Sequence, residues 1–513
     1  MNKSREQKAK KNILSTVLKQ IISMLCGIVI PRTMIGAFGS VAYGATTSIT
    51  QFLSYISLLE GGIGRVARGA FYIPLAQKDE KRISGIYNAI KAFFNKIGIL
   101  FIVYTLVIAT IFYDIADIKE LPRNYIFWLV IAISLSTVFN YLWGISNLTL
   151  LNADQKQYLT NAVITITNIL NAFFVIVLVK MKIGILGVKL FSSFIFIIRP
   201  VFYSYYVKKT YKLRKEEKDV NALKQKWSGL GQHMAYFIHT NTDIILLTLF
   251  ADLKYVAIYS VYHLVVFNIW NIASAFSGGM EAAFGEMIAK NENATLVKSY
   301  RYYKALLSTI AFILFSSAAV LIVPFIRLYT KGVADANYIQ PVFAMILLMS
   351  EAINCLSLPC SSLPISANCL KQTRWGAYSE ALVNIVVSSV LIFWNPLLGV
   401  AIGTFAATLL KAIYYMNYSS KKILKIRRRN VFFTFGITIT AIAVVAIMGI
   451  NIIEKVVINN FILWILYGAI TFVSISIIGF GVLIFLFPKE IKVLVTKVLN
   501  IIKKAIKKYG KKQ

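Results

Sequence analysis

Long apolar stretches separated by short polar segments recur from one end of the chain to the other. Each stretch holds about 20 residues, the length that an α-helix needs to cross the hydrocarbon core of a bilayer. The pattern therefore predicts an all-α polytopic membrane protein with about 14 transmembrane helices. The predicted spans are residues 13–34, 38–62, 84–112, 124–150, 158–179, 183–206, 231–250, 255–280, 302–326, 338–366, 373–394, 397–418, 431–453 and 459–487.

The composition supports this class and excludes several others. Of 513 residues, 58% are hydrophobic and 15% are charged, whereas soluble domains are about 45–50% apolar and about 25% charged. A soluble enzyme, a disordered chain and a disulfide-rich secreted domain are therefore excluded. The 4 Cys and 3 His form neither a CxxC pair nor a cluster with metal-ligand spacing, so we expect no disulfide framework and no metal site.

Positive charge is concentrated on alternate loops. The formal net charge is +34, from 55 Lys and Arg against 21 Asp and Glu. Because these charges lie in short segments between spans, we interpret them as orientation signals and contacts to anionic lipids, and we expect no nucleic-acid partner. The loops on the side of the two termini hold 40 Lys and Arg, and the opposite loops hold 8. Since cytoplasmic loops carry the positive excess, both termini are predicted to be cytoplasmic.

The two ends of the chain have distinct patterns. The first residues, MNKSREQKAKKN, are basic and are followed by no cleavage site, which predicts a retained cytoplasmic N-terminus rather than a signal peptide. Residues 489–513 place apolar side chains on one helical face and lysines mostly on the other. This pattern predicts a basic amphipathic helix on the anionic inner leaflet.

An internal repeat relates the first six spans to the next six. Matching residues are offset by about 212–216 positions; for example, Tyr43 falls on Tyr259, and Leu186-Gly187-Val188 falls on Leu398-Gly399-Val400. Six spans is an even number, so the two copies have the same orientation and form parallel repeats, as in transporters built of two lobes. The predicted parts are a six-helix lobe at 1–207, a cytoplasmic linker at 208–230, a second six-helix lobe at 231–418, appended helices 13 and 14 at 431–487, and the basic tail at 489–513.

This 6+6+2 plan resembles that of the polysaccharide (O-antigen type) flippases. The passage TNTDIILLTLFADLKYVAIYS, from span 7 into span 8, and the polar end of span 2 at Glu60-Gly61-Gly62-Ile63-Gly64 are similar to that family. The family belongs to the superfamily that includes multidrug and toxin extrusion (MATE) transporters and peptidoglycan lipid flippases. The resemblance covers about residues 1–420 and implies a MATE-like fold.

The resemblance also implies a function. The chain would translocate an undecaprenyl-pyrophosphate-linked oligosaccharide from the inner to the outer leaflet of the bacterial cytoplasmic membrane by alternating access, for O-antigen, capsule or exopolysaccharide synthesis. We expect a monomer, with a polysaccharide polymerase as a partner.

Basic residues inside or beside the spans are candidates for cargo binding. A lipid-linked sugar pyrophosphate carries about two negative charges, which Arg grips with a planar fork and Lys meets as a point charge. The candidates for a cationic lumen are Arg32, Arg65, Arg68, Lys189, Arg199 and Lys411. The alternative is that these side chains reach toward the membrane surface or pair with neighbours inside the membrane.

Acidic and imidazole groups inside spans are candidates for coupling to an ion. His239 and Asp243 lie one turn apart on the same helix face, and Glu351 lies in span 10. An acid beside an imidazole can hold a proton or help to bind Na⁺, so coupling to Na⁺ or H⁺ is expected without any other cofactor. The alternative is a hydrogen-bonded cluster that joins span 7 to a neighbour.

Three prolines are candidates for hinges or gates. Pro31 lies in span 1, and Pro359 and Pro364 lie in span 10. Each proline removes a backbone donor, and we expect Ser361, Ser362 and Asn354 to satisfy the carbonyls freed in span 10. The bent helix is either a moving gate or a static kink.

The candidates therefore favour a flippase over two other classes. A cation-coupled multidrug exporter on the same fold is the alternative; it would favour acidic and aromatic residues in its cavity. A surface-polysaccharide polymerase or ligase would need a large outward loop or a nucleotide-sugar motif, and the sequence contains neither. We therefore expect the chain not to be an enzyme.

Overall fold

A computed structural model describes residues 3–60, 63–214, 218–219, 230–275, 277–453, 456, 458–488 and 490. Within these ranges most of the chain is helical, short turns and loops join the helices, and no strand occurs. Contacts divide the chain into unit 1, Met1–Ser260 with Gly332–Ala336, and unit 2, Val261–Lys331 with Asn337–Gln513. The predicted tail at 489–513 lies almost wholly outside the described residues.

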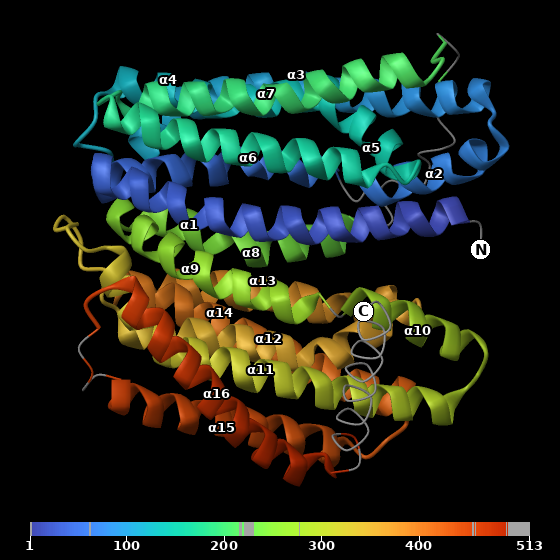
Figure 1. The fold of residues 1–513 in the computed structure, drawn as a ribbon, viewed down its shortest axis with the longest axis vertical. Coiled ribbons are helices and arrows are strands. Elements are labelled where there is room, and N and C mark those ends of the chain that lie inside the picture. Colours follow the sequence, from blue (N-terminus) through green and yellow to red (C-terminus); the bar gives the residue numbers. More distant parts are fainter. Residues whose placement is uncertain are drawn as a thin grey trace, which may run out of the picture. The chain divides into compact units, whose positions relative to one another are not determined.

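Unit 1 is a bundle of long helices with short breaks (Figure 1). Helix α1 packs along α6, α4 packs along α7, and α3 packs along α4. The elements are α1 (Lys3–Ser54), η1 (Tyr55–Glu60), α2 (Ile63–Gln77), α3 (Glu80–Ile115), α4 (Arg123–Phe139), η2 (Asn140–Gly144), α5 (Ile145–Ala153), α6 (Gln157–Lys180), α7 (Ile185–Thr210) and α8 (Leu230–Phe250).

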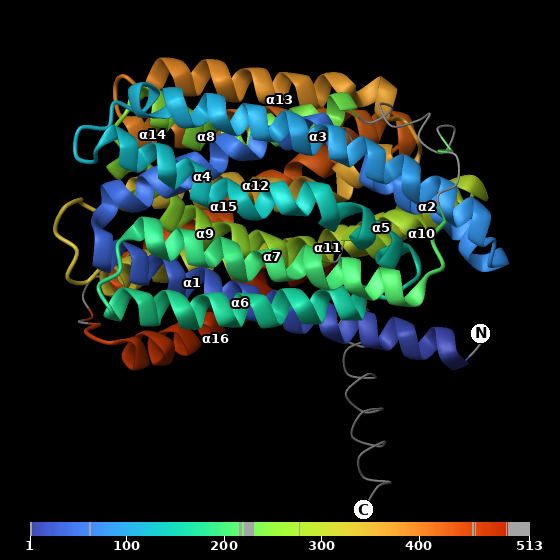
Figure 2. The ribbon, with the colours of Figure 1, turned by 90° about the horizontal axis from the view of Figure 1, so that it is seen from above.

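Unit 2 is also a helical bundle, and α9 begins in unit 1 and ends in unit 2. Within it, α13 packs along α14, α12 contacts both α11 and α14, and α11 packs against both α15 and α16 (Figure 1 and Figure 2). The elements are α9 (Leu253–Ser274), α10 (Ser277–Ala289), α11 (Asn293–Tyr329), α12 (Pro341–Ser366), α13 (Leu370–Leu391), α14 (Pro396–Tyr418), η4 (Ser419–Ile423), α15 (Arg428–Ile453) and α16 (Phe461–Leu486).

The α13–α14 pair is packed through small residues. A Cβ atom on Gly403 would lie 2.0 Å from Ser388 Oγ, and one on Gly399 would lie 2.6 Å from the backbone nitrogen of Ile392. The two backbones can therefore approach this closely only because these positions lack a side chain. Close packing of small residues is the usual way in which membrane helices associate, since lipid offers no hydrophobic drive.

The predicted class, an all-α polytopic membrane protein, is confirmed. Among the described residues, 11 helices are long and apolar enough to cross a membrane. The count is lower than the number of predicted spans for three reasons: spans 1 and 2 merge in α1, span 7 is represented by Thr240–Phe250, and α13 contains several charged residues. The predicted lobe boundaries, which rest on the sequence repeat, stay a prediction.

The start of the predicted linker is held against unit 1. Tyr211, just after α7, donates a hydrogen bond to Asp154 Oδ2 at 2.5 Å, and Lys156 Nζ donates to Tyr211 Oη at 3.1 Å. Burial, and then the hydrogen bond to Asp154, raises the pKa of Tyr211 above its ordinary value. The rest of the linker mostly lies outside the described residues.

Candidate functional site

A cavity of about 480 Å³, with apolar walls and a set of polar side chains among them, lies inside unit 1. Its walls come from α1 with η1, α4 with η2, α6 and α7. Six of its polar lining residues are Thr50, Ser54, Ser57, Ser136, Thr137 and Asn171. Hydroxyl and amide groups can both donate and accept hydrogen bonds, so the walls suit a hydroxylated or anionic group.

Lys189 provides the positive charge of this cavity. Among the described residues that line it, Lys189 is the charged one, and no described carboxylate lies in the lining. Ser192 and Ser193, three and four residues later on α7, line the same cavity because those spacings share a helix face. Ser193 Oγ also donates to the carbonyl of Ala132 at 2.5 Å, which fixes α7 against α4. The Lys189 ammonium lies inside a membrane bundle, where a charge is costly, so its presence points to a function.

A π-helical turn, η2, brings a tyrosine to the edge of the cavity. Tyr141 lines the cavity and donates a 2.6 Å hydrogen bond to Glu60 Oε1 at the end of η1. Short π-helical segments widen a helix locally and are frequent at functional sites. Asn171, on α6, presents a buried Oδ1 with no hydrogen-bond partner in the described part of the chain. The cavity therefore contains an acceptor as well as the Lys189 ammonium.

Arg32 lies on a different face of α1 from the cavity. Ile30 and Met34 line it, and Arg32 is two residues from each, about 160° around the helix. The Arg32 guanidinium instead reaches along α1 toward Gly36, where a Cβ would lie 3.7 Å from its Nη1. The structure therefore does not bring Arg32 and Lys189 together in this cavity.

Arg199 joins α7 to α6. Its Nε donates to Thr167 Oγ1 at 2.7 Å, and its Nη2 donates to Asn168 Oδ1 at 2.6 Å. The guanidinium carbon also lies 4.4 Å from the ring centroid of Phe196, a cavity residue. Because the described partners are neutral, Arg199 keeps its positive charge close to the cavity while it holds the two helices together.

The remaining basic candidates of unit 1 lie on α2. Arg68 is exposed, and its Nε donates to the backbone carbonyl of Gly64 at 3.2 Å. Arg65 is on the same helix, but its side chain lies outside the described residues.

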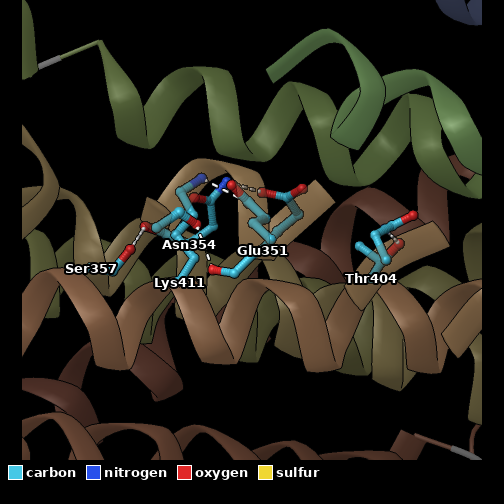
Figure 3. Close-up of polar contacts among 9 residues, drawn as sticks. Glu351, Asn354, Ser357, Thr404 and Lys411 are labelled. Carbon is cyan, nitrogen blue, oxygen red and sulfur yellow. Dashed lines mark hydrogen bonds and ion pairs between the residues drawn. The ribbon is translucent and has the colours of Figure 1, made fainter. Parts of the chain in front are cut away.

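Lys411 belongs to a separate polar network inside unit 2 (Figure 3). Its Nζ donates to Glu380 Oε1 at 3.0 Å, an ion pair between α14 and α13 in which the carboxylate is almost wholly buried. On α12, Asn354 donates to Glu351 Oε2 at 3.1 Å. The expected pairing inside the membrane therefore applies to Lys411, and its charge is compensated in place.

The candidates on α8 show a hydrogen-bonded arrangement. Tyr259 Oη donates to Asp243 Oδ2 at 2.8 Å, and Asn241 accepts a hydrogen bond from Gln51 on α1. These contacts fit the structural alternative, in which the polar cluster joins α8 to its neighbours. The side chain of His239 lies outside the described residues, so its pairing with Asp243 stays a prediction.

The break in α1 does not fall at its predicted proline. Helix α1 runs through Pro31 and breaks at Gly39, whose φ of 79° and ψ of 173° are not helical. Glycine tolerates this positive φ because it has no Cβ. Helix α12 continues through both Pro359 and Pro364.

The carbonyl freed by Pro364 is satisfied from outside α12. Pro364 cannot donate to the Cys360 carbonyl, and Ser419 Oγ in η4 donates to it at 2.7 Å. The expectation that α12 itself supplies these donors is therefore wrong at this position. Ser362 donates to Leu358 instead, at 2.9 Å, because a serine hydroxyl reaches the carbonyl one turn before it on its own helix.

Sequence reasoning missed the roles of two residues, Tyr141 and Asp335, and one specific pairing between charged residues that it had noted. Nothing in the sequence marks Tyr141 as a cavity residue, because aromatic residues in transmembrane spans usually pack against other helices. The Glu380–Lys411 pair could have been suspected, since the two residues lie on neighbouring predicted spans. Asp335, in an outward loop of the predicted topology, contacts the break in α1 across 295 residues of sequence.

Comparison with solved structures identifies the fold. The lipid II flippase MurJ, in an inward closed conformation, matches with a TM-score of 0.69 and 17% sequence identity, covering 92% of this chain and 100% of that one. An inward-facing multidrug resistance MATE family transporter of the MOP superfamily matches with a TM-score of 0.60 and 12% identity, over 83% of this chain and 98% of that one. The MATE multidrug transporter DinF-BH matches with a TM-score of 0.54 and 15% identity, over 83% and 96%.

No family model matches the sequence, and no curated protein matches it either. The class defined by the fold is nevertheless plain: the chain is a multi-pass helical membrane protein, and its architecture is the one shared by a lipid flippase and multidrug transporters. The sequence expectation of a MATE-like fold is confirmed. At these sequence identities the similarity establishes the fold only, and the cargo has to be inferred from the residues of this chain.

Proposed function

We propose that the chain is a flippase that moves an undecaprenyl-pyrophosphate-linked oligosaccharide from the inner to the outer leaflet of the bacterial cytoplasmic membrane. The observation that carries the proposal is the cavity of unit 1, in which the Lys189 ammonium lies among hydroxyl and amide groups with no described carboxylate in the lining. Such a cavity attracts an anionic, hydroxylated head and disfavours organic cations. The product would serve surface polysaccharide synthesis.

The basic candidates have different roles in this proposal. Lys189 contacts the anionic head, and Arg199 positions α6 and α7 while it adds to the positive potential. Arg32, Arg65 and Arg68 remain candidates for guiding the head outside this cavity. Lys411 does not contribute to an attractive potential, because Glu380 neutralises it.

The cycle and its partners are proposed on the same basis. Alternating access exposes the cavity to one leaflet and then to the other, with both termini in the cytoplasm. Asp243 and Glu351 are candidates for coupling to H⁺ or Na⁺, the basic tail is a candidate for binding anionic lipids, and a polysaccharide polymerase is the expected partner of a monomeric flippase.

A second function, a cation-coupled multidrug exporter, is favoured by one observation in unit 2. Glu351 on α12 accepts a hydrogen bond from Asn354, so unit 2 carries a carboxylate inside its bundle, the type of group that binds organic cations. The two functions differ in their dependence on Lys189: loss of this ammonium weakens binding of an anionic head, whereas it does not weaken binding of an organic cation.

The test is reconstitution of the protein in proteoliposomes with a fluorescent lipid-linked oligosaccharide. Lys189→Ala should slow flipping about tenfold or more, since a hydrogen bond to a charged group contributes about 1.5–3 kcal/mol. Lys189→Arg should keep most of the activity. Lys180→Ala is the matched control, because Lys180 is exposed at the end of α6 and should not affect the rate.

Deleting the protein in its host separates the two functions. Accumulation of lipid-linked repeat units in the cytoplasmic leaflet supports the flippase. Unchanged lipids together with altered dye efflux would support the exporter. Equal flipping by Lys189→Ala and the unsubstituted protein would remove Lys189 from the cargo path.

A further inference from the structure

The break in α1 is occupied by a carboxylate from a distant part of the chain. Asp335 Oδ2 accepts a 2.6 Å hydrogen bond from the backbone N–H of Ser40, and Asp335 Oδ1 accepts a 2.8 Å hydrogen bond from Ser40 Oγ. The first N–H groups after a helix break have no partner within the helix, and a carboxylate is well suited to accept from them. Asp335 therefore acts as a cap for the second half of α1.

Gly39 leaves the space that this contact needs. A Cβ on Gly39 would lie 2.9 Å from Asp335 Oδ2, and its φ of 79° already disfavours any side chain. The backbone break and the bound carboxylate thus depend on the same small residue.

The loop that carries Asp335 belongs to one unit by its contacts and to the other by its chain connections. Residues Gly332–Ala336 group with unit 1, whereas α11, which ends at Tyr329, and α12, which begins at Pro341, group with unit 2. Any conformational change in which α11 and α12 carry this loop away from α1 must break both hydrogen bonds of Asp335.

The contact has the character of a reversible bond. Ser40 is fully buried, whereas Asp335 is exposed to solvent. When the carboxylate leaves Ser40 it passes directly into water, so release does not strand a buried charge. Opening therefore costs the two hydrogen bonds to Ser40 but no desolvation of the carboxylate.

We propose that Asp335 is a detachable strap, which fastens the α11–α12 loop to the break in α1 in one state of the transport cycle and releases it in another. The proposal rests on the transport cycle proposed above, but it does not depend on the identity of the cargo. Asp335 is a positioning residue in this scheme and does not touch the cargo.

The first experiment measures opening without any cargo. In a chain whose four cysteines are replaced by alanine, Ser40→Cys is labelled with a water-soluble maleimide in liposomes. Adding Asp335→Asn should speed labelling about tenfold, because the lost charged hydrogen bonds favour the open state. Adding Asp252→Asn is the matched control, because that carboxylate caps α9 locally, accepting from Lys254 N at 2.7 Å. Equal labelling with and without Asp335→Asn overturns the proposal.

The second experiment fixes the strap in place. Ser40→Cys combined with Asp335→Cys should form a disulfide on oxidation, and the oxidised protein should lose flipping and recover it on reduction. Failure to cross-link, or full flipping by the cross-linked protein, overturns the strap. If the unsubstituted protein flips no lipid-linked oligosaccharide, the proposed function fails, and the labelling experiment still decides whether the strap opens.

Discussion

The α6–α7 pair of unit 1 and the α13–α14 pair of unit 2 are each joined by a basic side chain, but its partner is neutral in one pair and charged in the other. In the first, Arg199 donates to the amide of Asn168; in the second, Lys411 donates to the carboxylate of Glu380. Partners are 31 residues apart in both pairs, and one offset of 212 residues, within the range of the sequence repeat, carries Arg199 to Lys411 and Asn168 to Glu380.

The difference lies in what happens to the positive charge. A neutral amide stabilises the Arg199 guanidinium by hydrogen bonding and leaves its charge in place, whereas Glu380 cancels that of Lys411. Unit 1 thereby keeps two interior positive charges near its cavity, with Lys189 as the second. The same helix pair occurs in both copies of the repeat. In unit 1 it keeps a positive charge that can attract an anionic head, and in unit 2 its charges cancel and it only supports the fold.

The largest effect on stability should come from removing one partner of the Glu380–Lys411 ion pair. Glu380→Ala leaves the Lys411 ammonium buried without its carboxylate, and breaking a buried pair in this way costs about 3–5 kcal/mol. Thermal unfolding in detergent should show a lower Tm than for the equivalent change in unit 1, Asn168→Ala. The double variant Glu380→Leu with Lys411→Met should recover most of the loss; a Tm loss equal to that of Asn168→Ala would break the comparison.

An intermediate effect is expected when unit 1 is given the chemistry of unit 2. Asn168→Glu places a carboxylate beside Arg199 and cancels a positive charge near the cavity. Flipping in proteoliposomes should fall about tenfold, corresponding to about 1.4 kcal/mol, while Tm should stay the same or rise. Asn168→Gln is the control of equal size without the charge. Unimpaired flipping by Asn168→Glu would show that the charge of Arg199 is irrelevant to transport.

The smallest effect should come from exchanging the two cations. Arg199→Lys cannot reach Thr167 and Asn168 together, because an ammonium lacks the planar fork, so it should lose about 1 kcal/mol of stability. Lys411→Arg keeps the single carboxylate partner. Urea or thermal unfolding of both variants measures the difference, and a greater loss from Lys411→Arg would contradict the roles assigned to the two sites.

The membrane fold could be predicted from the sequence because hydropathy reports span length directly. All the predicted spans fall on helices, including that over α13, whose Lys371, Arg374 and Glu380 lower its apparent hydropathy. The apolar runs are properties of local sequence alone, whereas the helix boundaries are not: α1 begins at Lys3 and joins two predicted spans.

The site was only partly accessible to sequence reasoning because it depends on how each helix is rotated. Arg32 and Lys189 were grouped as lumen candidates. Arg32, however, lies two positions from both Ile30 and Met34, so it is on the opposite side of α1 from the face that lines the cavity. Lys411 was grouped with them as well, and its pairing depends on the rotation of α13 against α14. Asp335 could not be connected to Ser40, because a contact across 295 residues has no local signal.

The hydrogen bond from Ser419 to the Cys360 carbonyl has a consequence for how this protein changes over evolution. Pro364 leaves the Cys360 carbonyl without a backbone donor, and the Ser419 hydroxyl supplies one. The residues at 364 and 419 therefore depend on each other. A relative that replaces the proline with an ordinary residue regains its own backbone donor there and frees position 419 to vary. Among sequences of this lineage, a hydroxyl at 419 should therefore accompany proline at 364 and drift once the proline is gone.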